Sequence, residues 1–428
     1  MKVFKFGGAS VKDADAVRNV AIILQKFRNE QLVVIISAMG KTTNALEKVV
    51  ADWYAGNPEL DTHLESVILY HQSIASELFP DKQNPVYARM EAWFGQLQAY
   101  LTGDPSMNYD YDYDQVVSIG ELVSTSIVHE YLLQEGLNCS WLDVRALIRT
   151  NDSWREGRVD WKITETQIKK TVIPLVRDSA SSIVLTQGFL GSTSGGDTTT
   201  LGREGSDYTA AIFCYALNAE EMVIWKDVPG LLNADPKYFS KTEKLATISY
   251  REAIELSYYG ATIIHPKTIK PLQNKDIPLR IKSFVDPDSI GSLIHLNTAS
   301  DSLIPSFIFK VEQVLISISP RDFSFIDEQN LSEILAIFAR FSIHIHLMQN
   351  TALSFSVCVD NNQRRLPLLF EELGRNFKIL YNTGLELITI RHYDQATIDR
   401  VMEDGKTILL EMRSRLTAQF VVRPSTNY

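Results

Sequence analysis

The sequence has little cysteine, no long apolar run and no excess of positive charge. Its three cysteines, Cys139, Cys214 and Cys358, lie far apart and in apolar surroundings. This spacing argues against a disulfide framework or a metal cluster and predicts three reduced core residues. We find no signal-peptide pattern and no apolar run long enough to cross a membrane. We therefore expect a cytoplasmic protein without a membrane partner.

The charge balance is acidic. The 428 residues include 42 Lys and Arg against 52 Asp and Glu, a net charge of −10. This composition does not provide the basic face that nucleic-acid binding needs. An acidic protein that binds an anion must concentrate its positive charge in one site. The length predicts two or three domains.

The N-terminus carries the first candidate for such a site. A short strand, Val3 to Phe6, runs into Gly7-Gly8 and then Ser10, with Lys5 near the end of the strand. Backbone N–H groups that follow a strand and open a helix can bind a phosphate. Two glycines alone could be a tight turn, but Lys5 and a similar segment downstream favour a phosphate site.

Strands and helices alternate through the first 300 residues, which predicts an α/β domain with a mainly parallel sheet. Continuous apolar runs such as Leu32 to Ser37 are expected of strands covered on both faces. The predicted segments are strands at 3–6, 32–37, 182–186 and 222–225, helices from 17 to 27, across most of 42–102 and at 208–217, and a surface loop at 103–114.

The pattern changes after a cluster of Pro, Asp, Ser and Gly at 284–291, so we place a domain boundary near residue 298. The following elements form a compact βαββαβ unit at about 313–382, then a shortened second unit at 383–428 that residues 305–312 would complete. The predicted segments are strands at 314–319, 343–348, 353–359, 378–381, 385–390, 407–412 and 418–422, and helices at 331–341, 366–373 and 394–404.

A second anion-binding segment lies before the helix predicted at 208–217. It reads Leu201-Gly-Arg-Glu-Gly-Ser-Asp207 and brings Arg203 and Asp207 to a helix N-terminus. Arginine can hold a carboxylate through two parallel hydrogen bonds. The segment from Trp225 to Gly230 follows a strand and could line a nucleotide pocket.

These motifs together resemble the ordered signature of the aspartate kinases, and the resemblance covers nearly the whole chain. It implies a three-layer amino-acid kinase fold at 1–298 and an ACT-like regulatory region at 299–428. The motifs are Lys5 to Val11, Ser37-Ala38 through Thr43-Asn44, Gly120-Glu121, Leu201 to Asp207, Asp227 to Gly230, and His265-Pro266.

The resemblance implies transfer of the γ-phosphoryl group of ATP to the side-chain carboxylate of L-aspartate, which begins lysine, threonine, methionine and diaminopimelate biosynthesis. Lys5 would stabilise the transferred group, Asp207 would orient Lys5 or the nucleotide, Arg203 would hold the α-carboxylate and Glu121 the ammonium. Mg²⁺ would arrive on ATP without a dedicated protein site. The remaining implied positions are Ser37, Thr43, Glu204, Gly205 and Ser206 for the substrate, and Gly7, Gly8, Ser10, Lys226, Asp227, Leu232, Lys237 and Thr262 for the nucleotide.

Four positions depart from the family pattern. Ala9 stands where a hydroxyl residue is usual, Glu204 where Gly or a small residue is usual, and Thr262 and Leu232 where Lys and an aromatic residue are common. A carboxylate at 204 must point away from the anion or weaken its binding. Since Lys5, Arg203 and Asp207 are all present, we still expect activity.

The ACT-like region implies an amino-acid effector and a homodimer or higher homo-oligomer. His344 and His346 occupy a segment where lysine-sensitive members often have Asp, and Thr351-Ala352 replaces a common Ser-Glu pair. We therefore expect weak sensitivity or insensitivity to lysine. The two histidines could also bind a metal, but a pair without a third ligand is usually structural.

Two other functions remain open. The chain could phosphorylate another substrate on the same fold, such as glutamate, carbamate or a nucleoside monophosphate, although Glu121 with Arg203 suits an α-amino acid. It could also be a non-catalytic amino-acid sensor, for which loss of Lys5 or Asp207 would be the mark. We expect no homoserine dehydrogenase fusion, and we expect His265 to start a helix rather than to catalyse.

Overall fold

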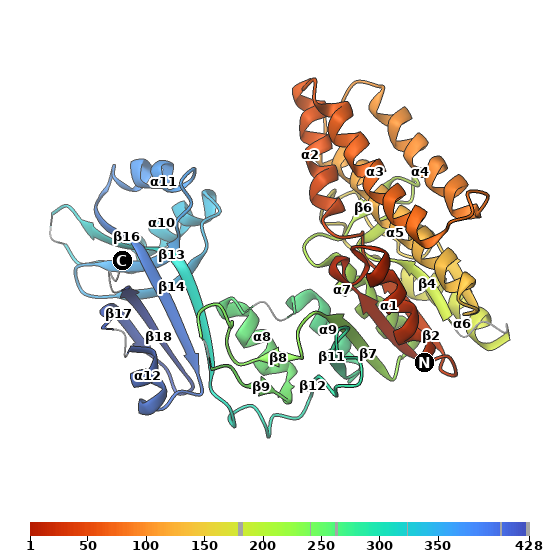
Figure 1. Cartoon of the computed structure of the whole chain (residues 1–428). Helices are drawn as coiled ribbons and strands as arrows, with labels where there is room; N and C mark the ends of the chain where they lie inside the picture. The colour runs from red at the N-terminus through yellow and green to blue at the C-terminus, as the bar shows by residue number, and fades with distance from the viewer. Residues whose placement is uncertain (179–182, 240, 262–263, 323, 403–404, 425–428) are drawn as a thin grey trace. The chain divides into compact units, whose positions relative to one another are not determined.

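The computed structural model describes the whole chain except residues 179–182, 240, 262–263, 323, 403–404 and 425–428 (Figure 1). The chain divides into two compact units. The first contains Met1–Leu231, Ala246–Ile254 and Ile264–Thr298, and the second contains Leu232–Leu245, Glu255–Ile263 and Ala299–Tyr428. The two short segments that group with the second unit make this division differ from a single break at residue 298.

The first unit is built on an eight-stranded sheet with the order β10-β12-β11-β7-β1-β2-β4-β3. Every pairing in it is parallel except that of β11 with β12. The strands are β1 (Lys2–Phe6), β2 (Leu32–Ile36), β3 (Cys139–Leu142), β4 (Ile183–Gln187), β7 (Glu221–Lys226), β10 (Thr247–Ser249), β11 (Leu279–Ser283) and β12 (Ser292–His295).

Helices cover both faces of this sheet, which explains why its central strands are apolar throughout. All five residues of β2 and all five of β4 are buried. The helices are α1 (Ala14–Gln25), α2 (Thr42–Ala55), α3 (Leu60–Leu78), α4 (Pro85–Leu101), α5 (Tyr109–Gln134), α6 (Trp161–Asp178), α7 (Gly205–Leu217), α8 (Tyr250–Tyr259), which ends in the second unit, and α9 (Pro266–Asn274), with short 3₁₀ turns at Gly8–Val11 and Val144–Ala146.

The register of the central strands brings their carboxyl ends to one edge. Lys5 on β1 lies opposite Ile35 of β2 and Ile224 of β7. The segments that leave β1, β2, β4 and β7 therefore emerge side by side. Ligands of open α/β sheets bind at this edge. The described chain also contains two small ribbons, β5 (Leu190–Ser192) with β6 (Thr198–Thr200), and β8 (Leu231–Leu232) with β9 (Lys244–Leu245).

Helix α5 corrects the prediction of a loop at 103–114, because it already begins at Tyr109. Asn108 caps it by accepting a hydrogen bond from the Tyr111 backbone, and Asp110 and Asp112 favour its N-terminus. Among the described residues, one helix, α5, has the length and apolar composition needed to cross a membrane. The sequence had led us to expect no such run. Of the most apolar window of α5, 94% is buried inside the protein, as in the core helix of a soluble domain.

The second unit holds a six-stranded antiparallel sheet with the order β14-β15-β13-β16-β18-β17. Its two long strands pair along their length, so that 313–320 faces 377–385 and 306–310 faces 387–391. The strands are β13 (Ser306–Pro320), β14 (Ile345–Asn350), β15 (Phe355–Asp360), β16 (Phe377–Arg391), β17 (Thr407–Arg413) and β18 (Thr417–Arg423).

Strand β16 corrects the prediction of two separate strands at 378–381 and 385–390. Gly384, at φ +65°, lies near a register shift between β13 and β16, so the chain bends without turning back. Helices α10 (Glu328–Arg340) and α11 (Leu366–Leu373) pack over one half of the sheet, and α12 (Gln395–Met402) over the other. The predicted fold class, an α/β kinase-type domain followed by an ACT-like α+β region, is confirmed.

Gly120 provides a test of how closely α5 packs on α2. A Cβ atom there would lie 2.9 Å from Thr42 Cγ2 and 3.2 Å from Leu46 Cδ1, whereas a Cβ on Gly95 in α4 would meet nothing within 4 Å. We expect Gly120→Ala to lower the free energy of unfolding by about 1–3 kcal/mol through overpacking. Gly95→Ala should raise it by about 0.5–1 kcal/mol through helix propensity. Urea denaturation measures both, and an unchanged Gly120→Ala midpoint would contradict the packing.

Candidate active site

A cavity of about 620 Å³ opens at the carboxyl edge of the sheet in the first unit. It lies among the ends of β1 and β2, the first turns of α2 and α7, and the middle of α5. Its volume is sufficient for a small substrate beside part of a nucleotide. Its lining includes Lys5, Gly8, Ser37, Thr43, Glu121, Arg203, Glu204, Gly205, Ser206 and Asp207, which the sequence predicted, and Ala38, Gly40, Tyr113, Arg155, Glu156, Phe189, Thr200 and Gly202.

The loops after β1 and β2 touch each other at this edge. The Ser37 backbone donates to the Phe6 carbonyl at 3.1 Å, and the Gly40 backbone donates to the Gly8 carbonyl at 3.0 Å. A Cβ atom on Gly8 would lie 2.7 Å from the Gly40 carbonyl oxygen, so only glycine fits there. The close approach places the amides of the first loop beside the cavity.

Lys5 and Asp207 form a buried ion pair. The Lys5 Nζ atom lies 2.8 Å from Asp207 Oδ1, and the two side chains are only 12% and 6% exposed. The approach is ionic and lacks the alignment of a hydrogen bond. Lys5 stands on the central strand and Asp207 in the first turn of α7, where an acidic residue also favours the helix N-terminus. Asp207 therefore fixes where the Lys5 ammonium points.

Glu121 is the second buried acid of the cavity. Burial raises the pKa of its carboxyl to about 8, against the opposing effects of a hydrogen bond from the Ala38 backbone and the nearby Lys5 charge. Its Oε2 atom has no hydrogen-bond partner among the described residues. A buried carboxylate without a partner is costly, so this atom is poised to accept a hydrogen bond or a cation from a ligand.

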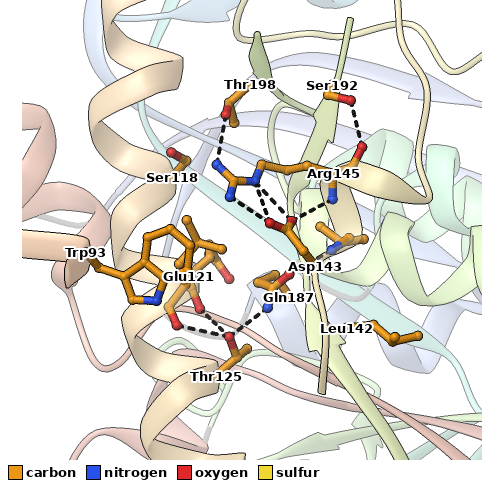
Figure 2. A network of polar contacts seen from close by, with 12 residues as sticks. Trp93, Ser118, Glu121, Thr125, Leu142, Asp143, Arg145, Gln187, Ser192 and Thr198 are labelled. Carbon is orange, nitrogen blue, oxygen red and sulfur yellow. Dashed lines mark hydrogen bonds and ion pairs between the residues drawn. The ribbon is translucent and has the colours of Figure 1, made fainter. Parts of the chain in front are cut away.

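A network of polar contacts surrounds Glu121 (Figure 2). Thr125, one turn further along α5, donates to the Glu121 carbonyl at 2.9 Å and accepts a 2.8 Å hydrogen bond from Gln187 at the end of β4. On the other side, Arg145 pairs with Asp143 at 2.6 Å and reaches Thr198 of β6 at 3.3 Å. The Thr125 contacts join α5 to the sheet, and the Arg145 contacts join the loop after β3 to the β5–β6 ribbon.

The carboxylate of Glu204, which lines the cavity, is bonded to the backbone before α9. Its Oε2 atom accepts a 2.8 Å hydrogen bond from the His265 backbone. Its φ of +54° is a left-handed conformation that favours glycine, which gives a physical reason for small residues at this position. His265 caps α9 by accepting from the Lys267 backbone, so the expectation that it starts a helix is confirmed.

Several predicted residues lie outside the cavity lining. Gly7 and Ser10 belong to the loop after β1, and Ser10 Oγ is buried without a hydrogen-bond partner among the described residues. Lys226 ends β7 and Asp227 follows it at the same sheet edge. Leu232 and Lys237 belong to the second unit, where Leu232 ends β8 and the Lys237 backbone donates to Asp235. Thr262 lies outside the described residues.

Sequence reasoning missed Tyr113 and Arg155. Tyr113 lies two helical turns before Glu121 on α5, in a stretch that composition assigned to a loop. No glycine or motif near Arg155 indicates a functional residue. Arg155 reaches the cavity only because the loop at 151–160 folds against α5. The helical spacing from Glu121 could have identified Tyr113, had α5 been predicted from Tyr109.

The comparisons with known proteins agree with this geometry. The model of the amino acid kinase family matches residues 1–283. Lysine-sensitive aspartokinase 3 of Escherichia coli K12 is 32% identical over 367 residues, which are 84% of this chain and 78% of that protein. The chain belongs to the amino acid kinase family and, within it, to the aspartokinases. The recognition of the aspartate kinase signature is thereby confirmed.

Further aspartokinases resemble the chain over most of its length. Chloroplastic aspartokinase 1 of Arabidopsis thaliana is 30% identical over 406 residues, which are 91% of this chain and 70% of that protein. The chain spans 32% of the length of a bifunctional aspartokinase/homoserine dehydrogenase from the same plant. Among solved structures, E. coli aspartokinase III with lysine and aspartate superposes at a TM-score of 0.82 and 28% identity, covering 99% of this chain and 96% of that one.

A second E. coli aspartokinase III structure, with aspartate and ADP, matches at a TM-score of 0.80 and 27% identity, covering 99% of this chain and 96% of that one. Family membership makes a nucleotide a substrate of this aspartokinase. It also establishes the activity as that of an aspartate kinase in amino-acid biosynthesis.

Proposed function

We propose that this aspartokinase performs its reaction by aligning two anions and neutralising their repulsion, with the residue roles that follow. A carboxylate of L-aspartate, ionised at pH 7, attacks the γ-phosphorus of ATP. The bond from that phosphorus to the bridging oxygen breaks, and 4-phospho-L-aspartate and ADP leave. No general base is needed, since the nucleophile carries no proton to remove.

The buried Lys5–Asp207 pair is the observation that carries this proposal. Lys5 faces the cavity from the central strand and stabilises the charge on the transferred phosphoryl group, while Asp207 orients it. The amides of the loop at Gly7, Gly8 and Ser10 bind the phosphates. Mg²⁺ enters as part of the MgATP substrate, with most of its ligands from phosphates and water. The positions that we propose to bind the rest of the nucleotide are Lys226, Asp227, Leu232, Lys237 and Thr262.

The same cavity also suits an α-amino acid. Glu121 accepts the ammonium group, Arg203 holds the α-carboxylate, and Ser37, Thr43, Gly205 and Ser206 fix the remainder. Glu204 acts indirectly, because its carboxylate is bonded to the His265 backbone. A kinase of nucleoside monophosphates or of carbamate would have no use for an ammonium acceptor, and a sensor would not need the Lys5–Asp207 pair.

We further propose a cytoplasmic homodimer or higher homo-oligomer, with an amino-acid effector at the ACT-like region. The boundaries proposed for the domains are 1–298 for catalysis and 299–428 for regulation, with ACT-like units at about 313–382 and 383–428. Residues 306–310 support the completion of the second unit, since they pair with 387–391.

Acyl phosphate formation tests the reaction. With MgATP and L-aspartate, hydroxylamine should trap aspartyl hydroxamate, and L-glutamate should give none. Lys5→Ala should lower kcat by on the order of 10²–10³, because it removes a preorganised charge from the transition state. Lys2→Ala is the matched control, since Lys2 lies on the same strand and pairs with Glu30 at 2.6 Å. Full activity of Lys5→Ala would contradict the assignment.

Glu121 predicts a pH dependence. Since the pKa of its carboxyl is raised to about 8, the group is protonated below that pH and ionises as pH rises. Only the ionised form attracts the aspartate ammonium. The KM for aspartate should therefore fall by roughly tenfold per pH unit up to about pH 8 and then level off. In Glu121→Gln the steady-state KM for aspartate should be higher and independent of pH. If the KM of this variant still fell with rising pH, Glu121 would not be the ammonium acceptor.

The second unit supports a prediction about lysine. A cavity of about 520 Å³ there is lined by His344, His346, Tyr258 and Met348, among others, and its described lining contains no carboxylate. The nearby Asp360 is paired with His346 at 3.0 Å. Since a cationic effector finds no free acid, L-lysine should leave the initial rate unchanged at concentrations that inhibit the lysine-sensitive E. coli relative in a parallel assay. Saturable inhibition would overturn this expectation.

A further inference from the structure

Arg155 is a cation of the cavity that the preceding roles leave unused. It lines the same cavity as Arg203, and its guanidinium lies 4.1 Å from the centre of the Tyr113 ring. Its nearest carboxylates are Asp110 at 3.4 Å and Glu47 at 3.5 Å. These distances exceed the 2.7–2.9 Å of strong charge-assisted hydrogen bonds, so the guanidinium is stacked on Tyr113 without being locked by either acid.

The backbone of Arg155 is held in a conformation that its side chain does not favour. Its φ is +62°, in the left-handed region where glycine is preferred. Asp114 stabilises this conformation, because one of its oxygens accepts from the Arg155 backbone at 2.9 Å and from the Thr200 backbone at 3.0 Å. The Thr200 hydroxyl donates to the other oxygen at 2.7 Å. Backbone strain maintained by buried contacts is a feature of functional sites.

The two helices that Arg155 contacts also carry residues assigned to the amino acid. Glu47 lies one turn after Thr43 on α2, and Tyr113 lies two turns, about 12 Å, before Glu121 on α5. Lys5 and Glu121 line the same cavity, and the Lys5 charge opposes the rise in the Glu121 pKa. Arg155 therefore lines the Tyr113 and Glu47 side of the cavity that Glu121 and Arg203 also line.

We propose that Arg155 is a substrate-binding residue that, together with Arg203, holds the α-carboxylate of L-aspartate and exchanges its long contacts to Glu47 and Asp110 for it. By fixing the α-carboxylate at a set distance from Lys5, the two guanidinium groups select a substrate of aspartate length over glutamate. This inference rests on the proposed function, because it assumes the amino-acid orientation given by Glu121 and Lys5.

Steady-state kinetics and thermal melting of four variants test it. Arg155→Ala should raise the KM for aspartate by roughly ten- to a hundredfold, with kcat and the KM for ATP within about twofold of wild type. Arg155→Lys should recover part of the affinity, because lysine keeps the charge but loses the bidentate geometry. Arg158→Ala is the control, since Arg158 is exposed in the same loop and lies outside the described cavity lining.

Arg155→Gly separates binding from folding. Glycine relieves the left-handed strain, so the melting temperature should stay level or rise while the KM for aspartate rises as in Arg155→Ala. A KM within twofold of wild type in both Ala and Gly variants would overturn the proposal. So would a KM that rises only where the melting temperature falls. Absence of aspartyl hydroxamate with the wild-type protein would instead refute the proposed function itself.

Discussion

The site depends on one buried ion pair between two elements that are far apart in the sequence. Lys5 lies on the first strand and Asp207 in the first turn of α7, and they meet at 2.8 Å. A buried lysine charge needs a partner, and a buried aspartate needs one as well. The pair is therefore stable only when β1, α7 and the edge between them are assembled. The same assembly brings the loop amides, the α7 N-terminus and the cavity together. The charged catalytic edge therefore forms only when these elements are correctly folded.

Two charged residues beside this edge occupy backbone positions that favour glycine. Glu204 has φ +54° and Arg155 has φ +62°. Each is held by a specific hydrogen bond, from the His265 backbone to the Glu204 side chain and from the Arg155 backbone to Asp114. Glycine would adopt either conformation without help. At both positions a charged side chain replaces the glycine that the backbone would favour. Tertiary hydrogen bonds therefore stabilise the loop conformations.

Much of this arrangement could be predicted from the sequence because it depends on local signals. Apolar runs gave the central strands, the helical pattern across most of 42–102 corresponds to α2, α3 and α4, and the glycines with Lys5 indicated an anion site. Contacts between distant segments were missed. The start of α5 was missed for a local reason, because the Asn108 cap lies inside a loop-like composition. Strand β16 continues through Gly384 because its neighbour β13 has a matching irregularity. Arg155 carries no local signal at all, since its role follows from α2, α5 and β6 meeting around it.

The electrostatics of the cavity show how an acidic protein can bind two anions. The described lining carries the cations Lys5, Arg155 and Arg203 and the acids Glu121, Glu156, Glu204 and Asp207. By formal charge alone the cavity would repel its substrates. Asp207 is paired with Lys5 and Glu204 is bonded to the backbone before α9, while Glu121, whose pKa burial raises to about 8, ionises to receive the substrate ammonium. Arg203 and Arg155 remain as cations of the lining, and Arg155 makes only long contacts to Asp110 and Glu47. Anion affinity in this protein is therefore produced by neutralising acids in place, and it does not require a basic surface.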